Sequence, residues 1–356
     1  MAATTAAEPS SVHLVGSIAL DSVPEVFQTA GRVLGRRLGR IPDGEPGGRR
    51  LWISWQYPLL RANGYLRAGP PDVASGMGFQ PLALAPGVKA ADIHFGELGY
   101  AREARASYED FLAARAAGEI PADARFQVCL PTPYAVISAF CRGPDMLAIE
   151  AAYERAMIAE IGRIAAAIPH RDLCIQFDVC NEMVMIDGQL PFFRPPTFDD
   201  PMAEVMARLK RLAAAVPEDV ELGIHLCYGD LDAKHFVEPR DAAKLVEMAN
   251  ALAGGLPHAL AYVHMPVPAG RDDDGYFAPL DRLALNPATE LFLGLVHSDG
   301  AEATRRRIAA AAPHARAFGI ATECGIARQR TPDLVRSLLE VHAACSAEPA
   351  RTGAPS

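Results

Sequence analysis

The chain has 356 residues, of which half are hydrophobic and 22% are charged, and its formal net charge is -9 at pH 7. This composition favours a globular protein with a large core and argues against a nucleic-acid partner. Phosphate binding requires clustered Lys and Arg, and the longest basic run is Arg305-Arg306-Arg307. No apolar stretch approaches the roughly 18 residues of a membrane span, and residues 1–11 lack signal-peptide features. We therefore expect a cytoplasmic protein with no membrane partner and a flexible N-terminus at residues 1–11.

From residue 12 onwards, short apolar runs typical of strands alternate with longer segments of helical periodicity. This alternation is typical of an α/β fold with a parallel sheet. Nine strands are predicted, at residues 12–16, 38–41, 91–95, 126–130, 173–178, 220–225, 259–264, 291–297 and 319–322. Because this number is close to the eight strands of a (βα)8 TIM barrel, we expect residues 12–346 to form one such barrel.

The segments between the predicted strands should form an outer ring of helices. Two helix starts are marked by prolines, in Gly143-Pro144-Asp145 and Thr331-Pro332-Asp333. Residues 41–87 are rich in Gly, Pro and Trp, which predicts an inserted cap or long loop above the carboxyl-terminal face, with a short helix near residues 52–60. Residues 347–356 are expected to be a disordered tail.

Two distinctive charged segments lie at residues 40–47 and 271–276. Loops of this kind above a barrel commonly determine which substrate a site accepts. We therefore expect these segments to shape the substrate pocket.

Polar or metal-binding side chains gather where predicted strands end. They are Ser17, His94, Glu97, Asp178, His225, Cys227, His264, His297, Glu323 and Cys324. In a parallel barrel, the carboxyl ends of the strands share the one face that holds active sites. An open doubly wound sheet would instead spread these residues along a crevice.

Three of these residues, His225, Cys227 and Cys324, offer an imidazole and two thiolates, which are zinc ligands. Gly325 would allow the backbone to turn tightly beside them. Three protein ligands leave one coordination position open, as in catalytic zinc sites, and a thiol substrate bound there would lose its proton. The alternative is that His225 and Cys227 lie on opposite sides of the strand end and bind no metal.

The strand-end residues and their neighbours resemble the C-terminal catalytic half of cobalamin-independent methionine synthase, within a superfamily that includes uroporphyrinogen decarboxylase. The matching segments span residues 12–325 in the family's order, and the His-x-Cys-Tyr and Cys-Gly elements are the most specific. These segments are Leu14-Val15-Gly16-Ser17-Ile18, Gly96-Glu97, Leu130-Pro131-Thr132-Pro133-Tyr134, Gln176-Phe177-Asp178, His225-Leu226-Cys227-Tyr228, Leu295-Val296-His297-Ser298 and Glu323-Cys324-Gly325.

The resemblance implies a (βα)8 barrel that holds zinc and acts on a small-molecule thiol acceptor and an alkyl donor. The zinc ligands that it implies are His225, Cys227 and Cys324. It also implies a proton-donating His297, and acceptor binding by Ser17, Glu97 and Asp178. The two carboxylates suit an ammonium group, and backbone N–H groups beside Ser17 suit a carboxylate.

Two positions depart from the family. A glutamate on the following strand completes the family's zinc shell, whereas this chain has His264 there, either as a zinc ligand or as a substrate contact. Ser138-Ala139 replaces the Asn-Trp pair that helps to hold the folate in the family. We therefore expect homocysteine or a related thiol as the acceptor, but not methylfolate as the donor.

The leading hypothesis is a zinc-dependent methyl or alkyl transfer to a thiol, in which Asp178 also orients the acceptor at the catalytic centre. One alternative keeps the zinc and uses an epoxide or a corrinoid-bound methyl group as donor. Another is a metal-free, decarboxylase-like barrel in which Asp178 and the histidines act as acids and bases. A non-catalytic binding protein is the last.

Overall fold

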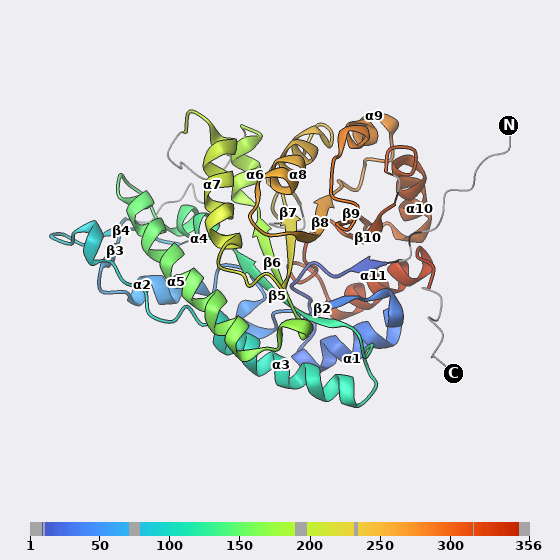
Figure 1. Ribbon diagram of the computed structural model, residues 1–356, viewed down its shortest axis with the longest axis horizontal. Coiled ribbons are helices and arrows are strands. Elements are labelled where there is room, and N and C mark those ends of the chain that lie inside the picture. Colours follow the sequence, from blue (N-terminus) through green and yellow to red (C-terminus); the bar gives the residue numbers. More distant parts are fainter. Residues whose placement is uncertain are drawn as a thin grey trace.

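The computed structural model describes residues 9, 11–70, 79–188, 198–230, 234–315 and 317–348. Eight parallel strands form one sheet in the order β1-β10-β9-β8-β7-β6-β5-β2, and helices surround it (Figure 1). A parallel bridge between Val12 and Leu38 joins the two edges of the sheet, so that the barrel is nearly closed. The predicted (βα)8 barrel is therefore confirmed.

The elements have the following bounds. The barrel strands are β1 (Val12–His13), β2 (Arg40–Pro42), β5 (Arg125–Pro131), β6 (Leu173–Val179), β7 (Glu221–Leu226), β8 (Leu260–Pro266), β9 (Glu290–Val296) and β10 (Gly319–Thr322). The α-helices are α1 (Val23–Leu34), α2 (Gln56–Ala62), α3 (Tyr100–Ala116), α4 (Pro133–Phe140), α5 (Met146–Ala167), α6 (Asn181–Ile186), α7 (Pro201–Ala213), α8 (Ala243–Gly255), α9 (Asp274–Phe277), α10 (Gly300–Ala311) and α11 (Pro332–Ala344).

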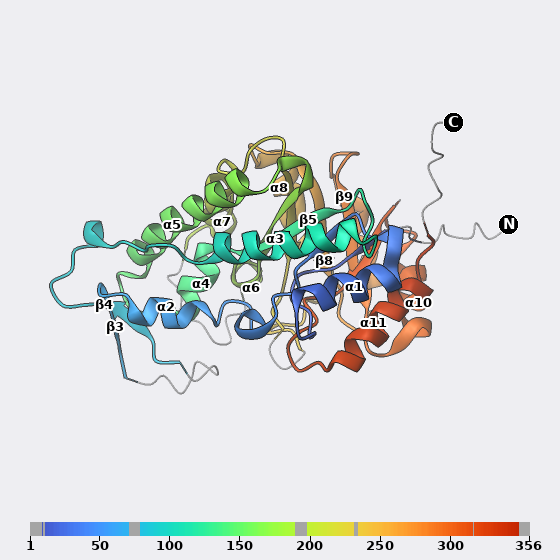
Figure 2. The same ribbon diagram turned by 90° about the horizontal axis from the view of Figure 1, so that it is seen from below.

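The two helix starts predicted from proline-containing segments are both found. The Thr331 side chain accepts a hydrogen bond from the Leu334 backbone N–H at 3.3 Å and caps α11. Helix α5 begins at Met146, directly after Asp145. Helices α1, α3 and α11 run along one side of the barrel (Figure 2). Within the described part of the chain, no helix combines the length and apolar character that crossing a membrane requires.

One predicted strand, at residues 91–95, is wrong. Ala90–Asp92 instead forms a short 3₁₀ helix, and the chain stays outside the barrel sheet. Ile93 is fully buried there, whereas residues 91, 92 and 94 are exposed. A single buried side chain thus imitates the alternation of a strand, but a strand without a neighbouring backbone has no ladder of hydrogen bonds to stabilise it.

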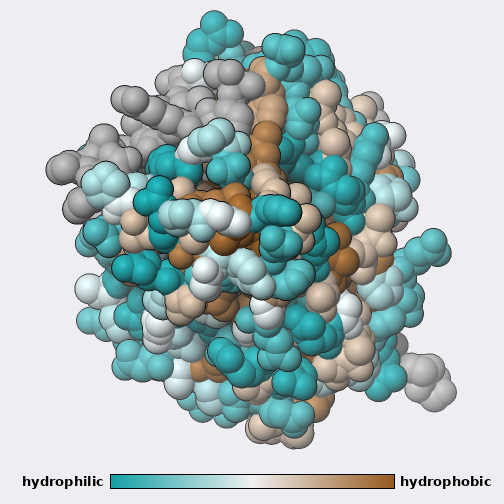
Figure 3. Space-filling view, turned by 90° about the vertical axis from the view of Figure 1, so that its left-hand side faces the viewer, coloured by the Kyte–Doolittle hydropathy of each residue, from teal (hydrophilic) through white to brown (hydrophobic). Residues whose placement is uncertain are grey.

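The inserted segment between β2 and α3 contains α2 and a two-stranded antiparallel hairpin, β3 (Leu66–Ala68) with β4 (Leu82–Leu84). This hairpin lies at the left end of the molecule in Figure 1, and the surface at that end is mostly hydrophilic with a band of hydrophobic residues across it (Figure 3). Residues 71–78 lie outside the described residues. So do most of the N-terminus and of the tail for which flexibility and disorder are predicted.

The barrel interior below the carboxyl-terminal face is filled by buried polar side chains. The Tyr262 hydroxyl donates to Gln176 Oε1 at 2.8 Å, and Gln176 Nε2 donates to Asp178 Oδ1 at 2.7 Å. Gly223 lies between the strands that carry these residues, and a Cβ atom there would lie 2.0 Å from the Tyr262 ring. The absence of a side chain at Gly223 therefore leaves space for the Tyr262 ring. From there Tyr262 hydrogen-bonds Gln176, which in turn hydrogen-bonds Asp178.

Candidate metal centre

Three neighbouring strands bring functional side chains to the same level of the barrel. In the strand register, Asp178 of β6 lies beside His225 of β7, which lies beside His264 of β8. All three side chains are buried. Cys227 follows the last residue of β7, and Cys324 follows β10 by two residues. Parallel strand ends thus place residues almost a hundred positions apart at one face.

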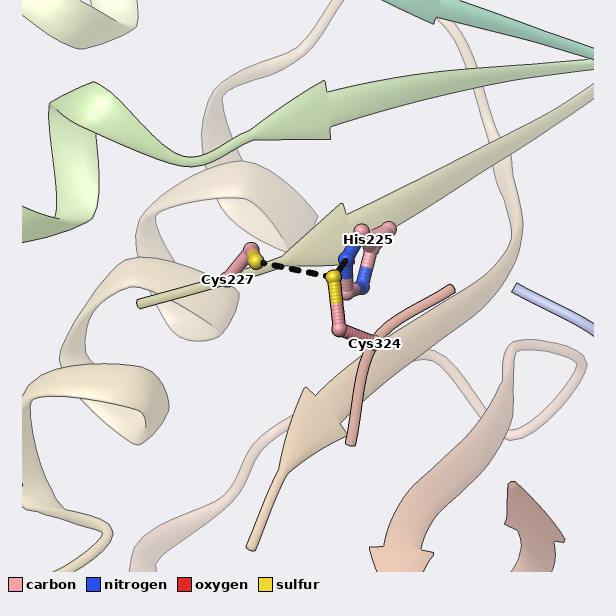
Figure 4. A group of neighbouring side chains, drawn as sticks. All are labelled: His225, Cys227 and Cys324. Carbon is pink, nitrogen blue, oxygen red and sulfur yellow. Dashed lines mark hydrogen bonds between the residues drawn. The ribbon is translucent and has the colours of Figure 1, made fainter. Parts of the chain in front are cut away.

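His225, Cys227 and Cys324 point toward one another (Figure 4). The two sulfurs are 3.5 Å apart, and Cys324 Sγ lies 3.8 Å from His225 Nε2. All three ligand atoms lie within 4.8 Å of one another. Tetrahedral zinc with Zn–S of about 2.3 Å and Zn–N of about 2.0 Å separates its ligand atoms by roughly 3.5–3.8 Å. The three residues therefore fit zinc, and His225 and Cys227 lie on the same side of the strand end.

The two thiols lie 3.5 Å apart, and Cys227 is buried whereas Cys324 is half-buried. The contact with the Cys180 thiol, together with burial, raises the pKa of Cys227 well above its usual value. The contact with Cys227, again together with burial, raises the pKa of Cys324 in the same way. Because two adjacent thiolates repel each other, this pair would ionise readily only around a bound cation.

A cavity lined by apolar and polar side chains opens beside these three residues. Besides these three residues, it is lined by residues from several parts of the chain. Those that bear on recognition are Ser17, Glu45, Trp52, Asp178, Cys180 and Arg328. Of the acceptor-binding residues predicted from sequence, Ser17 and Asp178 line this cavity.

Asp178 is buried at the cavity wall and accepts two hydrogen bonds. Gln176 Nε2 donates to Oδ1 at 2.7 Å, and Trp52 Nε1 donates to Oδ2 at 3.1 Å. Burial raises the pKa of Asp178 to about 7, although both hydrogen bonds lower it. The carboxylate is thus fixed in position, and a cationic group of a ligand would stabilise its ionised form.

Glu45 and Trp52 are functional candidates that sequence reasoning missed. Both line the cavity and have left-handed backbone conformations, with φ of 52° and 54°. Burial and the neighbouring carboxylates of Asp178 and Asp43 raise the pKa of Glu45 well above its usual value. A non-glycine residue in this conformation is strained, and such strain is concentrated at functional sites. Glu45 follows β2 by only three residues, so the tendency of functional side chains to follow strand ends could have indicated it as a site residue.

Arg328 joins the segment that carries Trp52 to the loop that follows β7. Its guanidinium donates to the backbone oxygen of Leu51 at 3.1 Å and to that of Asp230 at 3.0 Å. Asp230 belongs to the loop that follows Cys227. The charged segment at residues 40–47 thus contributes Glu45 to the pocket wall. Arg328 links the residues that follow this segment, through Leu51, to the loop after β7.

Three predicted site residues lie outside the three-ligand group and this cavity. Glu97 is exposed beside the segment whose predicted strand is absent. His297, at the end of β9, lines a second cavity with Glu323, and its Nδ1 lies 3.7 Å from Glu323 Oε2. Burial, with a contribution from Arg307, lowers the pKa of His297 to about 4. His264 is fully buried and hydrogen-bonded to His225.

Solved structures with the same architecture cover nearly the whole chain. A B12-independent methionine synthase from Shewanella sp. W3-18-1 in complex with selenomethionine aligns with a TM-score of 0.59 at 12% identity, over 95% of this chain and 96% of that chain. A putative vitamin-B12 independent methionine synthase from Listeria monocytogenes aligns over the same shares with a TM-score of 0.55, also at 12% identity.

These likenesses show a shared fold. No family model matches the chain, and no curated protein matches its sequence. The chemistry is therefore argued from the residues that converge at the carboxyl-terminal face of the barrel.

Proposed function

We propose that this protein holds zinc through His225, Cys227 and Cys324 and transfers a methyl or other alkyl group to a small-molecule thiol. The observation that carries the proposal is the convergence of two sulfurs and an imidazole nitrogen, within 4.8 Å of one another, beside a cavity that they help to line. Zinc bound there would lower the pKa of a thiol in the open coordination position, so that the thiolate forms at neutral pH.

Between heavy atoms the reaction breaks one bond, from the alkyl carbon to its leaving group, and forms one, from the thiol sulfur to that carbon. The acceptor thiol loses its proton, its sulfur attacks the alkyl carbon of the donor, and the bond from that carbon to its leaving group breaks with the electron pair on the leaving group. The thiol's proton passes to a leaving group that departs as an anion, such as the alkoxide of an opened epoxide, and to solvent when a sulfonium leaves as a neutral thioether. His297 remains a prediction for this step, because it lies in the neighbouring cavity beside Glu323.

The acceptor is best described as a thiol that also carries an ammonium group. Asp178 and Glu45 are two carboxylates on the cavity wall, and neither is paired with a Lys or Arg side chain by a salt bridge among the described residues. Burial, followed by repulsion from neighbouring carboxylates, raises the pKa of Glu45, and an ammonium between Asp178 and Glu45 would favour its ionised form. In this proposal Glu45 takes the position that sequence reasoning assigned to the exposed Glu97.

The residues at positions 138 and 139 bear on the identity of the donor. Ser138 and Ala139, which replace the family's folate-stacking pair, are buried within α4. They therefore present no surface on which a pterin ring could stack. We propose a donor other than methylfolate, and homocysteine or a related amino-acid thiol as acceptor.

The test is to incubate the zinc-loaded protein with homocysteine and, in turn, a sulfonium, a methyl-corrinoid, an epoxide and methylfolate as donor. Loss of free thiol and the mass of the product are measured. We expect an alkylated thiol with one donor other than methylfolate, and at least a roughly 100-fold lower rate in Cys227→Ser, which lacks a ligand. No product from any donor would contradict alkyl transfer even if zinc is bound.

A further inference from the structure

His264 is fully buried at the metal centre, and both nitrogens of its ring have partners. Its Nδ1 lies 2.7 Å from Nδ1 of His225, and its Nε2 lies 3.0 Å from the backbone oxygen of Thr322. Thr322 ends β10, two residues before Cys324. A chain of hydrogen bonds therefore runs from the end of β10 through His264 to His225.

The direction of these hydrogen bonds follows from elementary chemistry. A backbone carbonyl oxygen can only accept, so Nε2 of His264 must carry the hydrogen. A neutral imidazole has one N–H, which leaves a lone pair on Nδ1 of His264. Nδ1 of His225 must then donate to it. Neutral His225 consequently has its lone pair on Nε2, which is the atom that lies 3.8 Å from Cys324 Sγ.

Both rings are neutral in this arrangement because nothing in it stabilises a positive charge. The exposed fraction is 2% for His225 and 0% for His264. Among the described residues, neither ring has a hydrogen bond or salt bridge to a carboxylate. Two adjacent buried imidazolium groups would repel each other and lose their hydration, which is a large free-energy cost.

We propose that His264 is a positioning residue that fixes His225 in the Nδ1–H tautomer and so directs the Nε2 lone pair of His225 at the metal. The inference rests on the proposed zinc site for its purpose, although the tautomer itself follows from the hydrogen bonds alone. In water the Nε2–H form of a histidine is the more populated one, and it would present a hydrogen to the metal. Hydrogen-bond partners of this kind commonly orient a metal-binding histidine.

This arrangement also excludes His264 as a direct ligand without rearrangement. Ligation through Nδ1 would break the hydrogen bond to His225, and ligation through Nε2 would break the one to Thr322. His264 thus stands where the resemblance implies a ligating glutamate, but it acts through His225. The coordination position that a fourth protein ligand would fill remains for the thiol.

The tautomer is tested by nitrogen-15 NMR of zinc-free protein labelled at histidine, which separates the Nδ1–H and Nε2–H forms by their proton couplings. His225→Asn and His264→Gln identify the two sets of signals. We expect Nδ1–H for His225 and Nε2–H for His264. An Nε2–H form of His225 would overturn the inference. This readout needs no zinc, so it is independent of whether the proposed function is right.

The effect on the metal is tested with two variants of His264. In His264→Gln the amide oxygen can accept from His225 and the amide nitrogen can donate to Thr322, whereas His264→Leu can do neither. Competition with a chromophoric chelator should show zinc affinity close to normal in the first and about 10–100-fold weaker in the second. Equal affinities in the two variants would overturn the inference. Thermal unfolding checks that each variant is folded, and the NMR test stands if the leucine variant is not.

Absence of zinc binding by the unaltered protein would contradict the proposed function. The chain of hydrogen bonds through His264 would then have no metal ligand to orient. The tautomer of His225 would still decide whether the chain exists. The two failures are therefore distinguishable.

Discussion

Replacing Cys324 by serine is expected to remove most of the zinc from the purified protein. Purified without chelators, the unaltered protein should carry a near-stoichiometric amount of zinc. A serine hydroxyl remains protonated at neutral pH and is a poor zinc ligand, which leaves only His225 and Cys227 in the group. The loss of affinity should exceed the roughly 10–100-fold that removing a ligand's hydrogen-bond partner costs. Elemental analysis by mass spectrometry measures the zinc directly.

The matched control is Cys345→Ser, because Cys345 is also a buried cysteine but follows α11 and does not line the cavity. Its zinc content should equal that of the unaltered protein. Equal zinc in the Cys324→Ser protein and in the control would show that Cys324 is not a ligand.

Replacing Gly223 by alanine should destabilise the barrel by about 3 kcal/mol, at the upper end of the cost of overpacking a core. The added Cβ would lie 2.0 Å from Cζ of Tyr262 and 2.5 Å from its hydroxyl oxygen. The ring cannot move aside easily, because it is fully buried and its hydroxyl is hydrogen-bonded to Gln176. In addition, Cζ of Arg40 lies over the ring, 4.9 Å from its centroid. Denaturant unfolding measures the change, and a displaced Gln176 should also disturb Asp178.

Gly162→Ala is the matched control for that substitution. Gly162 lies in α5, is exposed, and has no heavy atom near the position of an added Cβ. Because glycine is a poor helix former, this change should instead stabilise the protein by about 1 kcal/mol. A Gly223→Ala protein as stable as the unaltered one would mean that Tyr262 does not fill the space described here.

The barrel and its three potential zinc ligands could be predicted because both depend on short-range sequence patterns. The strands β5 to β10 coincide with apolar runs of the sequence, and parallel strand ends necessarily meet at one face. His225, Cys227 and Cys324 therefore come together although they are far apart in the chain. The topology supplies the long-range information that the local sequence lacks.

The remaining parts of the site could not be predicted, because they depend on the paths of inserted segments and on the orientation of side chains. Glu45 lines the cavity and Glu97 is exposed, because an insertion and an absent strand decide their positions. Trp52 reaches Asp178 through a left-handed backbone that its residue type does not favour. The strand that carries His264 could be predicted, but the direction of its ring depends on His225 and Thr322.

Cys180 is a further cysteine close to the proposed zinc site, so the number of sulfurs bound to zinc shows whether the site is open or closed. It lies in the same cavity as the three ligands and contacts Cys227, but it is not part of the group whose ligand atoms lie within 4.8 Å of one another. If Cys180 filled the remaining position, the site would be closed and could not accept a thiol substrate.

X-ray absorption at the zinc edge, recorded before and after addition of homocysteine, measures this coordination most directly. We predict two sulfurs and one imidazole nitrogen from the protein, with a light atom in the remaining position that is replaced by a third sulfur when the thiol is added. Three sulfurs before any thiol is present, or a sulfur count that the thiol leaves unchanged, would contradict a zinc site that activates a thiol.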